Sequence, residues 1–261
     1  RSEREAGLME FAVAGSGSRG NATVIRAGST TVMVDCGFTF SEIKRRIERL
    51  SLTVDDLDAM LVTHEHGDHI SGIARLAARA DIPVYASAGT ARAAEQRRQF
   101  EGAMTFDSHA PFAIGDLEIT PIIVPHDAAE PTQFVLSDGV RRLAIMTDIG
   151  HVTPFVIGSL GGLDGLIVES NHDVGMLAAG PYPEALKRRV GGSYGHLSNE
   201  QTGELLCTLE LSNLHTLALA HLSEKNNRPE IAREAAARAL DCESDWVRIA
   251  DQDAGLPWQT L

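Results

Sequence analysis

Short apolar runs, separated by turns that contain glycine, proline and charged residues, set the pattern of this chain. Runs rich in β-branched and aliphatic residues predict strands at residues 11–14, 21–26, 30–34, 58–62, 83–86, 104–106, 117–124, 133–136, 142–146, 166–168 and 216–220. Apolar residues at helical spacing predict helices at residues 41–47, 70–78, 89–100 and 183–190. Such a mixture of strands and helices indicates an α/β protein.

A glycine-rich turn follows the first predicted strand. Gly15, Gly17 and Gly20 match the dinucleotide-binding pattern G-x-G-x-x-G. That pattern must open a helix, whereas residues 21–26 are β-branched and stop at Gly28. We therefore interpret the motif as a turn between two strands, and a nucleotide-binding fold is disfavoured.

The densest chemistry lies at residues 63–69, Thr-His-Glu-His-Gly-Asp-His, between a predicted strand and a predicted helix. Three imidazoles and two carboxylates in so short a loop are typical of a metal site, since one loop can then hold two adjacent ions. The alternative, a chance cluster of histidines on a solvated loop, is weaker because the chain has only 10 histidines. The zinc-protease pattern H-E-x-x-H is absent.

Length and composition bound the organisation. The 261 residues, 43% of them apolar, can bury a sizeable core. We expect residues 1–8 to be a leader or a cloning remnant and residues 9–261 to form a single domain without a membrane span. Cys36, Cys207 and Cys242 are odd in number and lack C-x-x-C spacing, which favours a reduced, cytoplasmic setting.

The net charge of −13 argues against a generic nucleic-acid coat protein. Basic clusters nevertheless occur within the acidic background, at residues 44–49, 92–98 and 187–189. Each of these clusters is either a solvated helix face or a contact with an anionic substrate.

The pattern H-x-H-x-D-H after an apolar strand resembles the metallo-β-lactamase superfamily. The resemblance implies a four-layer αββα sandwich of two mixed sheets with helices outside. It also implies a lone histidine, a lone aspartate and a final histidine at later strand ends, and His126, Asp148 and His221 occupy such positions. By analogy, His64, His66, His126 and Asp148 hold one divalent ion, and Asp68, His69, Asp148 and His221 hold the other.

Asp35 ends the third predicted strand, where the resemblance implies a carboxylate that orients the metal-binding loop. The alternative is an aspartate that starts an ordinary turn. The ligand types suit Zn, Mn or Fe alike.

Three longer segments narrow the resemblance to the WalJ (YycJ) family of exonucleases, which are related to RNase Z and RNase J: residues 15–23, residues 169–173, and residues 195–199 with 221–227. The family implies a cytoplasmic DNA exonuclease, with 5′-to-3′ polarity. Only 72 residues separate Asp148 from His221, too few for the inserted β-CASP domain of RNase J.

The chemistry expected of such a site is phosphodiester hydrolysis. Two ions about 3.5–4 Å apart lower the pKa of a shared water and place the resulting hydroxide in line with phosphorus. Asp68 would orient that hydroxide. His196 is the candidate general acid, because relatives have a histidine in the matching segment. The alternative for His196 is a structural histidine at a helix entry that Ser198 caps.

Neutral donors beside the second ion are candidates for holding the substrate phosphate without reading base identity: Ser198, Ser223, Asn226 and Asn227. The alternative is that Asn226 and Asn227 form a turn before a helix at Pro229. His172 either lines the cleft or satisfies backbone groups.

The sequence thus predicts a metal-dependent nuclease, most readily a DNA exonuclease with a nucleic acid partner and no membrane contact. A small-molecule hydrolase of the same fold is the second hypothesis, such as a cyclic phosphodiesterase, a lactonase or a glyoxalase II-like thioesterase. The acidic charge favours it, whereas His196 and residues 223–227 favour nucleic acid. A non-catalytic metal-binding protein is the third. The chain leaves open whether the protein is an oligomer.

Overall fold

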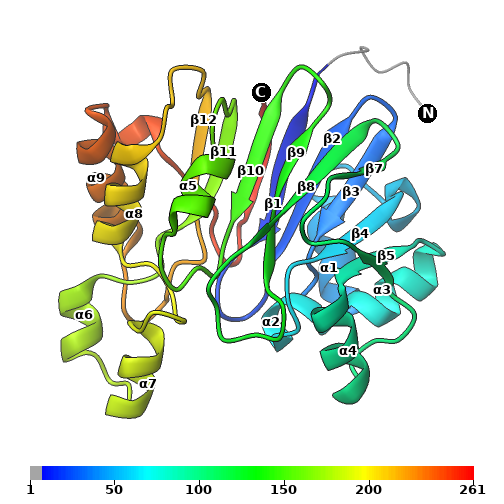
Figure 1. The fold of residues 1–261 in the computed structure, drawn as a ribbon, viewed down its shortest axis with the longest axis horizontal. Coiled ribbons are helices and arrows are strands. Elements are labelled where there is room, and N and C mark those ends of the chain that lie inside the picture. The colour runs from blue at the N-terminus through cyan, green and yellow to red at the C-terminus, as the bar shows by residue number, and fades with distance from the viewer. Residues whose placement is uncertain (1–7) are drawn as a thin grey trace.

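A computed structural model describes residues 8–261, and this part of the chain forms two β-sheets of seven strands each with helices on the outside (Figure 1). The two sheets pack face to face, which confirms the αββα sandwich expected from the sequence. The predicted leader lies outside the described residues apart from Leu8. Within the described part, every helix is too short or too polar to cross a membrane.

The first sheet combines an antiparallel meander with three parallel strands. In order across the sheet, its strands are β14 (Leu256–Thr260), β1 (Glu10–Gly15), β2 (Ala22–Ala27), β3 (Thr30–Val34), β4 (Ala59–Val62), β5 (Val84–Ser87) and β6 (Met104–Phe106). Pairing is antiparallel from β14 to β3 and parallel from β3 to β6. The sequence missed β14, because Pro257 interrupts its apolar pattern.

The second sheet repeats this plan. In order across the sheet, its strands are β13 (Arg248–Ile249), β12 (Thr216–Ala220), β11 (Gly165–Glu169), β10 (Arg142–Met146), β9 (Thr132–Ser137), β8 (Leu117–Ile123) and β7 (Phe112–Ile114). Pairing is antiparallel from β7 to β10 and parallel from β10 to β13. The strands β7 and β13 are so short that their sequences carry no periodic signal.

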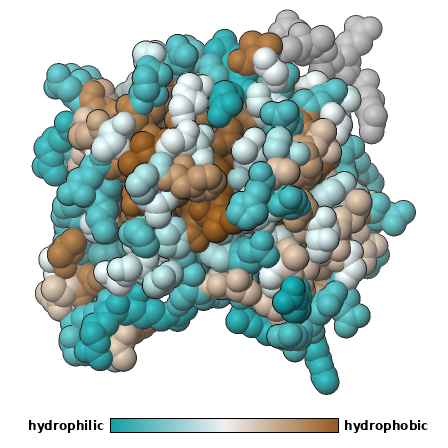
Figure 2. Space-filling model, in the orientation of Figure 1, coloured by the Kyte–Doolittle hydropathy of each residue, from teal (hydrophilic) through white to brown (hydrophobic). Residues whose placement is uncertain are grey.

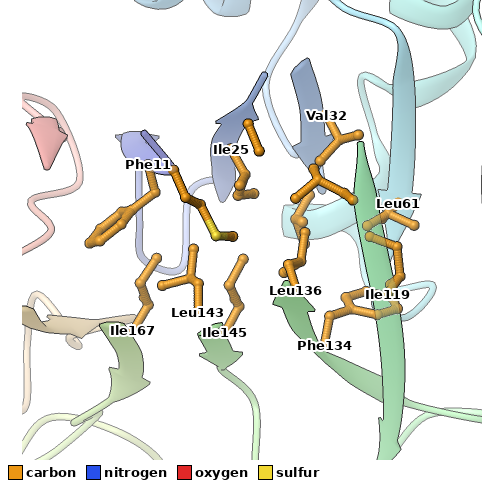
Figure 3. Close-up of a cluster of buried hydrophobic side chains, with 14 of the residues drawn as sticks. Phe11, Ile25, Val32, Leu61, Ile119, Phe134, Leu136, Leu143, Ile145 and Ile167 are labelled. Atoms are coloured by element: carbon orange, nitrogen blue, oxygen red, sulfur yellow. The ribbon is translucent and has the colours of Figure 1, made fainter. Parts of the chain in front are cut away.

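Three apolar clusters hold the layers together. The central one lies between the sheets, where side chains such as Phe11 and Ile25 of the first sheet meet Phe134 and Ile145 of the second (Figure 3). The outer clusters lie between each sheet and its helices. Because side chains alternate along a strand, a strand that is apolar on both faces can serve an inner and an outer cluster at once.

The helices form the outer layers. α1 (Phe40–Glu48), α3 (Ile73–Ala80) and α4 (Ala88–Gln96) pack on the first sheet, and α5 (Pro154–Ser159), α8 (Asn199–Thr208) and α9 (Pro229–Leu240) pack on the second. The remaining helical segments are α2 (Gly67–Ile70), α6 (Val174–Ala179), α7 (Glu184–Val190) and the 3₁₀ turns η1 (Val54–Asp56) and η2 (Ser244–Trp246).

Two predicted helices differ from the observed ones. The helix expected at residues 70–78 is divided into α2 and α3 at Gly72, where an added Cβ would collide with the backbone oxygen of Phe38. The helix expected to reach residue 100 ends at Gln96, since Arg98 adopts a left-handed φ of 56° that a helix cannot continue.

The parallel strands of both sheets end at one shared edge. Asp35 follows β3 and His221 follows β12, while Asp148 lies two residues beyond β10. All three adopt left-handed backbone conformations, with φ of 59°, 53° and 54° respectively. Such angles are uncommon outside glycine and concentrate at functional sites. This edge is therefore where the candidate site lies.

Candidate metal centre

Three imidazoles from two loops come together at this edge: His64, His66 and His126. One ring nitrogen of each lies within 4.8 Å of the others. The hydroxyl of Thr63 donates to Asp35 at 2.8 Å, so Nδ1 of His64 must donate to that hydroxyl at 2.9 Å. Nε2 of His64 is consequently a buried lone pair, and it has no hydrogen-bond partner.

His66 and His126 face each other, with Nδ1 of His66 3.3 Å from Nε2 of His126. The outer nitrogen of His66 donates to the backbone oxygen of Asp127 at 3.2 Å, and that of His126 donates to the backbone oxygen of Gly195 at 3.0 Å. Since a carbonyl oxygen only accepts, each neutral ring turns a lone pair toward the other. A cation between the rings would satisfy both lone pairs.

Asp35 orients a second group of donors. Its buried carboxylate accepts hydrogen bonds from the backbone and hydroxyl of Thr63 and from Nδ1 of His69, each at 2.8 Å. Nε2 of His69 then points toward carboxylate oxygens of Asp148 at 3.2 Å and Asp68 at 3.5 Å. This arrangement supports the orienting role predicted for Asp35.

Asp148 lies between the two groups. One of its oxygens is 3.2 Å from Nε2 of His69, and the other is 3.3 Å from Nδ1 of His221 and 3.8 Å from Nε2 of His126. Nε2 of His221 lies 3.4 Å from Asp68. A carboxylate in this position can contribute one oxygen to each of two neighbouring cations.

Charge within the cluster shifts the protonation equilibria strongly. Burial lowers the pKa of His221, but Asp148 and Asp68 outweigh burial and raise that pKa to about 10. Burial also opposes the charged form of His69, yet the same two carboxylates raise its pKa well above the usual value. Burial and the neighbouring imidazole of His69 instead lower the pKa of His64. Without a metal, protons on His69 and His221 offset the carboxylate charge.

The donor set fits divalent cations. Nε2 of His64, Oδ2 of Asp148 and Nδ1 of His221 are buried and have no hydrogen-bond partner. Buried polar atoms usually make hydrogen bonds, so three ligand atoms that make none in one cluster, two of them in close ion pairs, indicate where cations bind. Imidazole nitrogen and carboxylate oxygen are suitable donors for Zn, Mn or Fe.

Glu169 is a site residue to which the sequence analysis assigned no role. It is fully buried at the end of β11, and its Oε2 lies 3.1 Å from Nδ1 of His196 and 3.6 Å from Nδ1 of His221. Its Oε1 accepts from the backbone of Ile149 and Leu197. Nε2 of His196 is thereby left as the free nitrogen of a ring that lines the pocket. The sequence did carry a signal for Glu169. It is a carboxylate at the end of a buried strand, which is the kind of position that identified Asp148.

The glycine-rich turn packs against the metal cluster. It leads into strand β2, whereas a dinucleotide-binding motif would lead into a helix. Nδ2 of Asn21 lies 3.1 Å from Nε2 of His69, and Ser16 Oγ accepts from the backbone of His221 at 2.9 Å. Gly20 has a φ of 151°, and an added Cβ there would come within 2.7 Å of Phe38. The glycines therefore allow the turn to pass close beneath the site.

The pocket beside the cluster has a volume of about 230 Å³. Of the four predicted phosphate-binding residues, only Ser223 lines it. The hydroxyl of Ser198 caps α8, and the amide of Asn227 donates to Ser170 and Asn199. Both groups make hydrogen bonds within the fold and lie outside this pocket, so direct phosphate binding by Ser198 or Asn227 stays a prediction.

Asn226 is completely buried and donates to Ser223 Oγ, so it can act on a ligand only through Ser223. His172 is buried and absent from the pocket lining. The structure adds Arg189 to the pocket, ion-paired with Asp127 at 2.6 Å. The sequence analysis named the basic cluster at residues 187–189 but could not tell which of its side chains lines the pocket. The position of a residue on a helix does not show which loop elsewhere in the chain its side chain contacts.

The sandwich and the histidine-aspartate edge define the class: a metallohydrolase with the metal site where strand ends of both sheets meet. A model of the beta-lactamase superfamily domain matches residues 30–221. The chain is 35% identical over 259 residues to exodeoxyribonuclease YycJ of Bacillus anthracis, covering 95% of this chain and 97% of that protein. It is 31% identical over 237 residues to exodeoxyribonuclease WalJ of Streptococcus pneumoniae, covering 89% and 88%. The chain belongs to the beta-lactamase superfamily and, within it, to the YycJ and WalJ family of phosphodiester-hydrolysing enzymes.

Solved structures agree on the fold. The metallo-beta-lactamase fold protein YhfI of Bacillus subtilis superposes with a TM-score of 0.75 at 19% identity, covering 97% of this chain and all of that one. The short form of human tRNase Z superposes with a TM-score of 0.65 at 16% identity, covering 96% and 98%. At such identities the likeness establishes the architecture alone.

Proposed function

We propose that the protein is a metal-dependent DNA exonuclease with a dinuclear active site. The observation that carries this proposal is the match, along nearly the whole of both chains, to relatives named exodeoxyribonucleases. The retained donor cluster supports it, since a protein that only bound a partner would have no need for so many ionisable groups in one buried site.

The proposed ligands form two sets that share Asp148. The first is His64, His66 and His126, and the second is Asp68, His69 and His221. The sharing is supported by the two Asp148 oxygens, of which one lies 3.2 Å from Nε2 of His69 in the second set and the other 3.8 Å from Nε2 of His126 in the first. Divalent ions bound there would polarise a phosphodiester and lower the pKa of a water molecule toward neutrality.

Two side chains of the pocket would handle protons. Asp68 is partly exposed, and its carboxylate can accept a hydrogen bond from the attacking water. His196 is held through Nδ1 by Glu169, so a proton on its Nε2 can pass to the departing 3′-oxygen.

His196 has a second possible role. Its ring lies with Asp148 and His221 in one of the potential ligand groups. Its 3.1 Å contact with Glu169 favours the proton-donor role, since Nδ1 is the nitrogen that faces this group and is already occupied.

The finer features follow from family resemblance: DNA over RNA, 5′-to-3′ polarity and a cytoplasmic location. The second candidate, a small-molecule hydrolase, is favoured by the net charge of −13, because an acidic surface repels a polyanion. The pocket itself contains a positive charge despite the negative net charge of the chain, since Arg189 lines it.

The test is degradation of 5′-labelled and 3′-labelled DNA duplexes by purified protein supplied with Mn or Zn. We expect nucleotide release from one end, lost in Asp68→Ala and kept in Asp55→Ala, whose exposed side chain lies away from the pocket. Release from the 5′ end fixes the polarity. Turnover of bis(p-nitrophenyl) phosphate or a thioester without DNA degradation would replace the proposal by the small-molecule alternative. Metal binding without turnover of any of these substrates would favour the third hypothesis, a non-catalytic metal-binding protein.

A further inference from the structure

α6, α7 and their connecting loop form an arm beside the metal centre, residues 174–190. The arm extends beyond the sheets at the lower left of Figure 1, and Figure 2 shows hydrophilic residues over α7, whereas α6 exposes apolar residues such as Val174. Its helices are braced by Lys187, whose Nζ donates to the backbone oxygen of Ala178 at 2.6 Å. At its end, the backbone of His196 donates to Val190 at 2.8 Å. The arm is thereby fixed to the segment that carries the proposed general acid.

The arm supplies one wall of the 230 Å³ pocket, and the metal ligands supply another. The arm residues in this wall are Tyr182, Leu186, Arg189 and Val190. The proposed metal binding and hydrolysis use none of these four side chains. The wall is therefore suited to a part of the substrate other than the reacting phosphate.

Arg189 is held in a fixed orientation toward the metal centre. Its Nε donates to Asp127 at 2.6 Å, and the other carboxylate oxygen of Asp127 lies 3.4 Å from Nε2 of His126. A guanidinium has five N–H donors in a planar fork, and this pairing uses only the Nε side. The terminal nitrogens remain able to bind a phosphate oxygen.

Tyr182 provides a flat apolar surface in the same wall. Its ring is half-buried, and Nζ of Lys225 lies over the ring, 5.7 Å from its centroid. Leu186 and Val190 add aliphatic surface. A nucleobase is the flat, apolar part of a nucleotide, and aromatic side chains bind bases without sequence preference.

We propose that Tyr182 and Arg189 form a subsite for the terminal nucleotide, in which the ring packs against the base and the guanidinium holds a phosphate beside the metal centre. The inference rests on the proposed nuclease function and names the part of DNA that this pocket recognises. Such a subsite contacts one nucleotide through the face of its base and through its phosphate. It therefore suits an enzyme that removes nucleotides from the end of a DNA strand whatever their sequence.

The test measures binding of thymidine 5′-monophosphate and of inorganic phosphate to the Mn-loaded protein by calorimetry. Tyr182→Ala should weaken thymidine monophosphate binding about 5- to 100-fold and leave phosphate binding unchanged. Arg189→Ala should weaken both ligands about 10-fold or more. Arg188→Ala is the matched control, since its exposed side chain lies one position away on α7 and outside the pocket, and it should bind both ligands as the unaltered protein does.

Tyr182→Phe keeps the ring and should retain nucleotide affinity, which separates loss of stacking from loss of folding. The subsite is overturned if Tyr182→Ala and Arg189→Ala bind thymidine monophosphate as tightly as Arg188→Ala does. DNA degradation by the unaltered protein, measured alongside, decides the nuclease function independently. If that degradation is absent, the nuclease function fails while the binding data still decide whether a nucleotide subsite exists.

Discussion

Nδ1 of His66 and Nε2 of His126 lie 3.3 Å apart, and both are acceptors in the neutral rings. The outer nitrogens are committed to the backbone oxygens of Asp127 and Gly195, so neither ring can turn a proton inward without losing a hydrogen bond. A cation resolves the conflict between the lone pairs. Metal binding should therefore stabilise the observed conformation of the two loops that carry these histidines.

His126→Ala tests this relationship. A ligand at about 100 times its Kd adds about 2.7 kcal/mol to the free energy of unfolding, which for a chain of this size raises Tm by about 5–10 °C. We expect Mn or Zn to produce such a rise in the unaltered protein and in His109→Ala, whose side chain is exposed. The rise should be clearly smaller in His126→Ala, which loses a ligand of the first ion and keeps the ligands of the second. An equal rise in all three proteins would contradict the site.

Metal binding should release protons. The pKa of His221 is raised to about 10 in the metal-free protein, so the imidazole carries a proton at pH 7, and a ligand nitrogen must give that proton up. Metal affinity should therefore increase as pH rises from 7 toward 10. Titration calorimetry in Pipes and in Tris, whose ionisation enthalpies differ, measures the proton count. Identical heats in the two buffers would show that His221 is neutral before the metal binds.

Asp35→Asn should damage the site with little change in shape. Asparagine tolerates the left-handed φ of 59°, but its amide would meet the N–H of His69 or Thr63 with a donor in place of an acceptor. We expect metal affinity to fall about 10- to 100-fold and the free energy of unfolding to fall by about 1–3 kcal/mol. Denaturant melts and metal titrations check both values. Asp55→Asn, at an exposed position, should change neither.

Glu169→Gln should impair proton donation by His196. Glutamine can still accept from Ile149 and Leu197, but its amide would oppose Nδ1–H of His196 and favour the wrong tautomer. We expect the DNA degradation rate to drop about 10- to 100-fold, with an altered pH profile and normal metal affinity. A loss of metal binding in this variant would instead make His196 or His221 placement the main role of Glu169.

Prediction from sequence succeeded where chemistry is local. The loop at residues 63–69 carries four of its donors within six positions, and the strands that lead to Asp35, Asp148 and His221 are short apolar runs with clear ends. The three edge strands β7, β13 and β14 escaped detection, because each is held in its sheet by pairing with a neighbouring strand and has no clear periodic pattern of its own. The sequence could not show that the amide of Asn227 makes hydrogen bonds within the fold, because its partners Ser170 and Asn199 are distant along the chain.

The sequence by itself determined the α/β class and the residues able to hold metal, because periodicity and donor type are properties of short segments, and the sandwich followed from the family resemblance of the same segments. Only the tertiary structure decided which lone pairs meet, since His66 and His126 are 60 positions apart and their tautomers depend on backbone oxygens from other loops. The same holds for Glu169 behind His196 and for Arg189 across from Asp127. Hydrogen-bond direction and burial are set by neighbours in space, and these decide what each ionisable side chain can do.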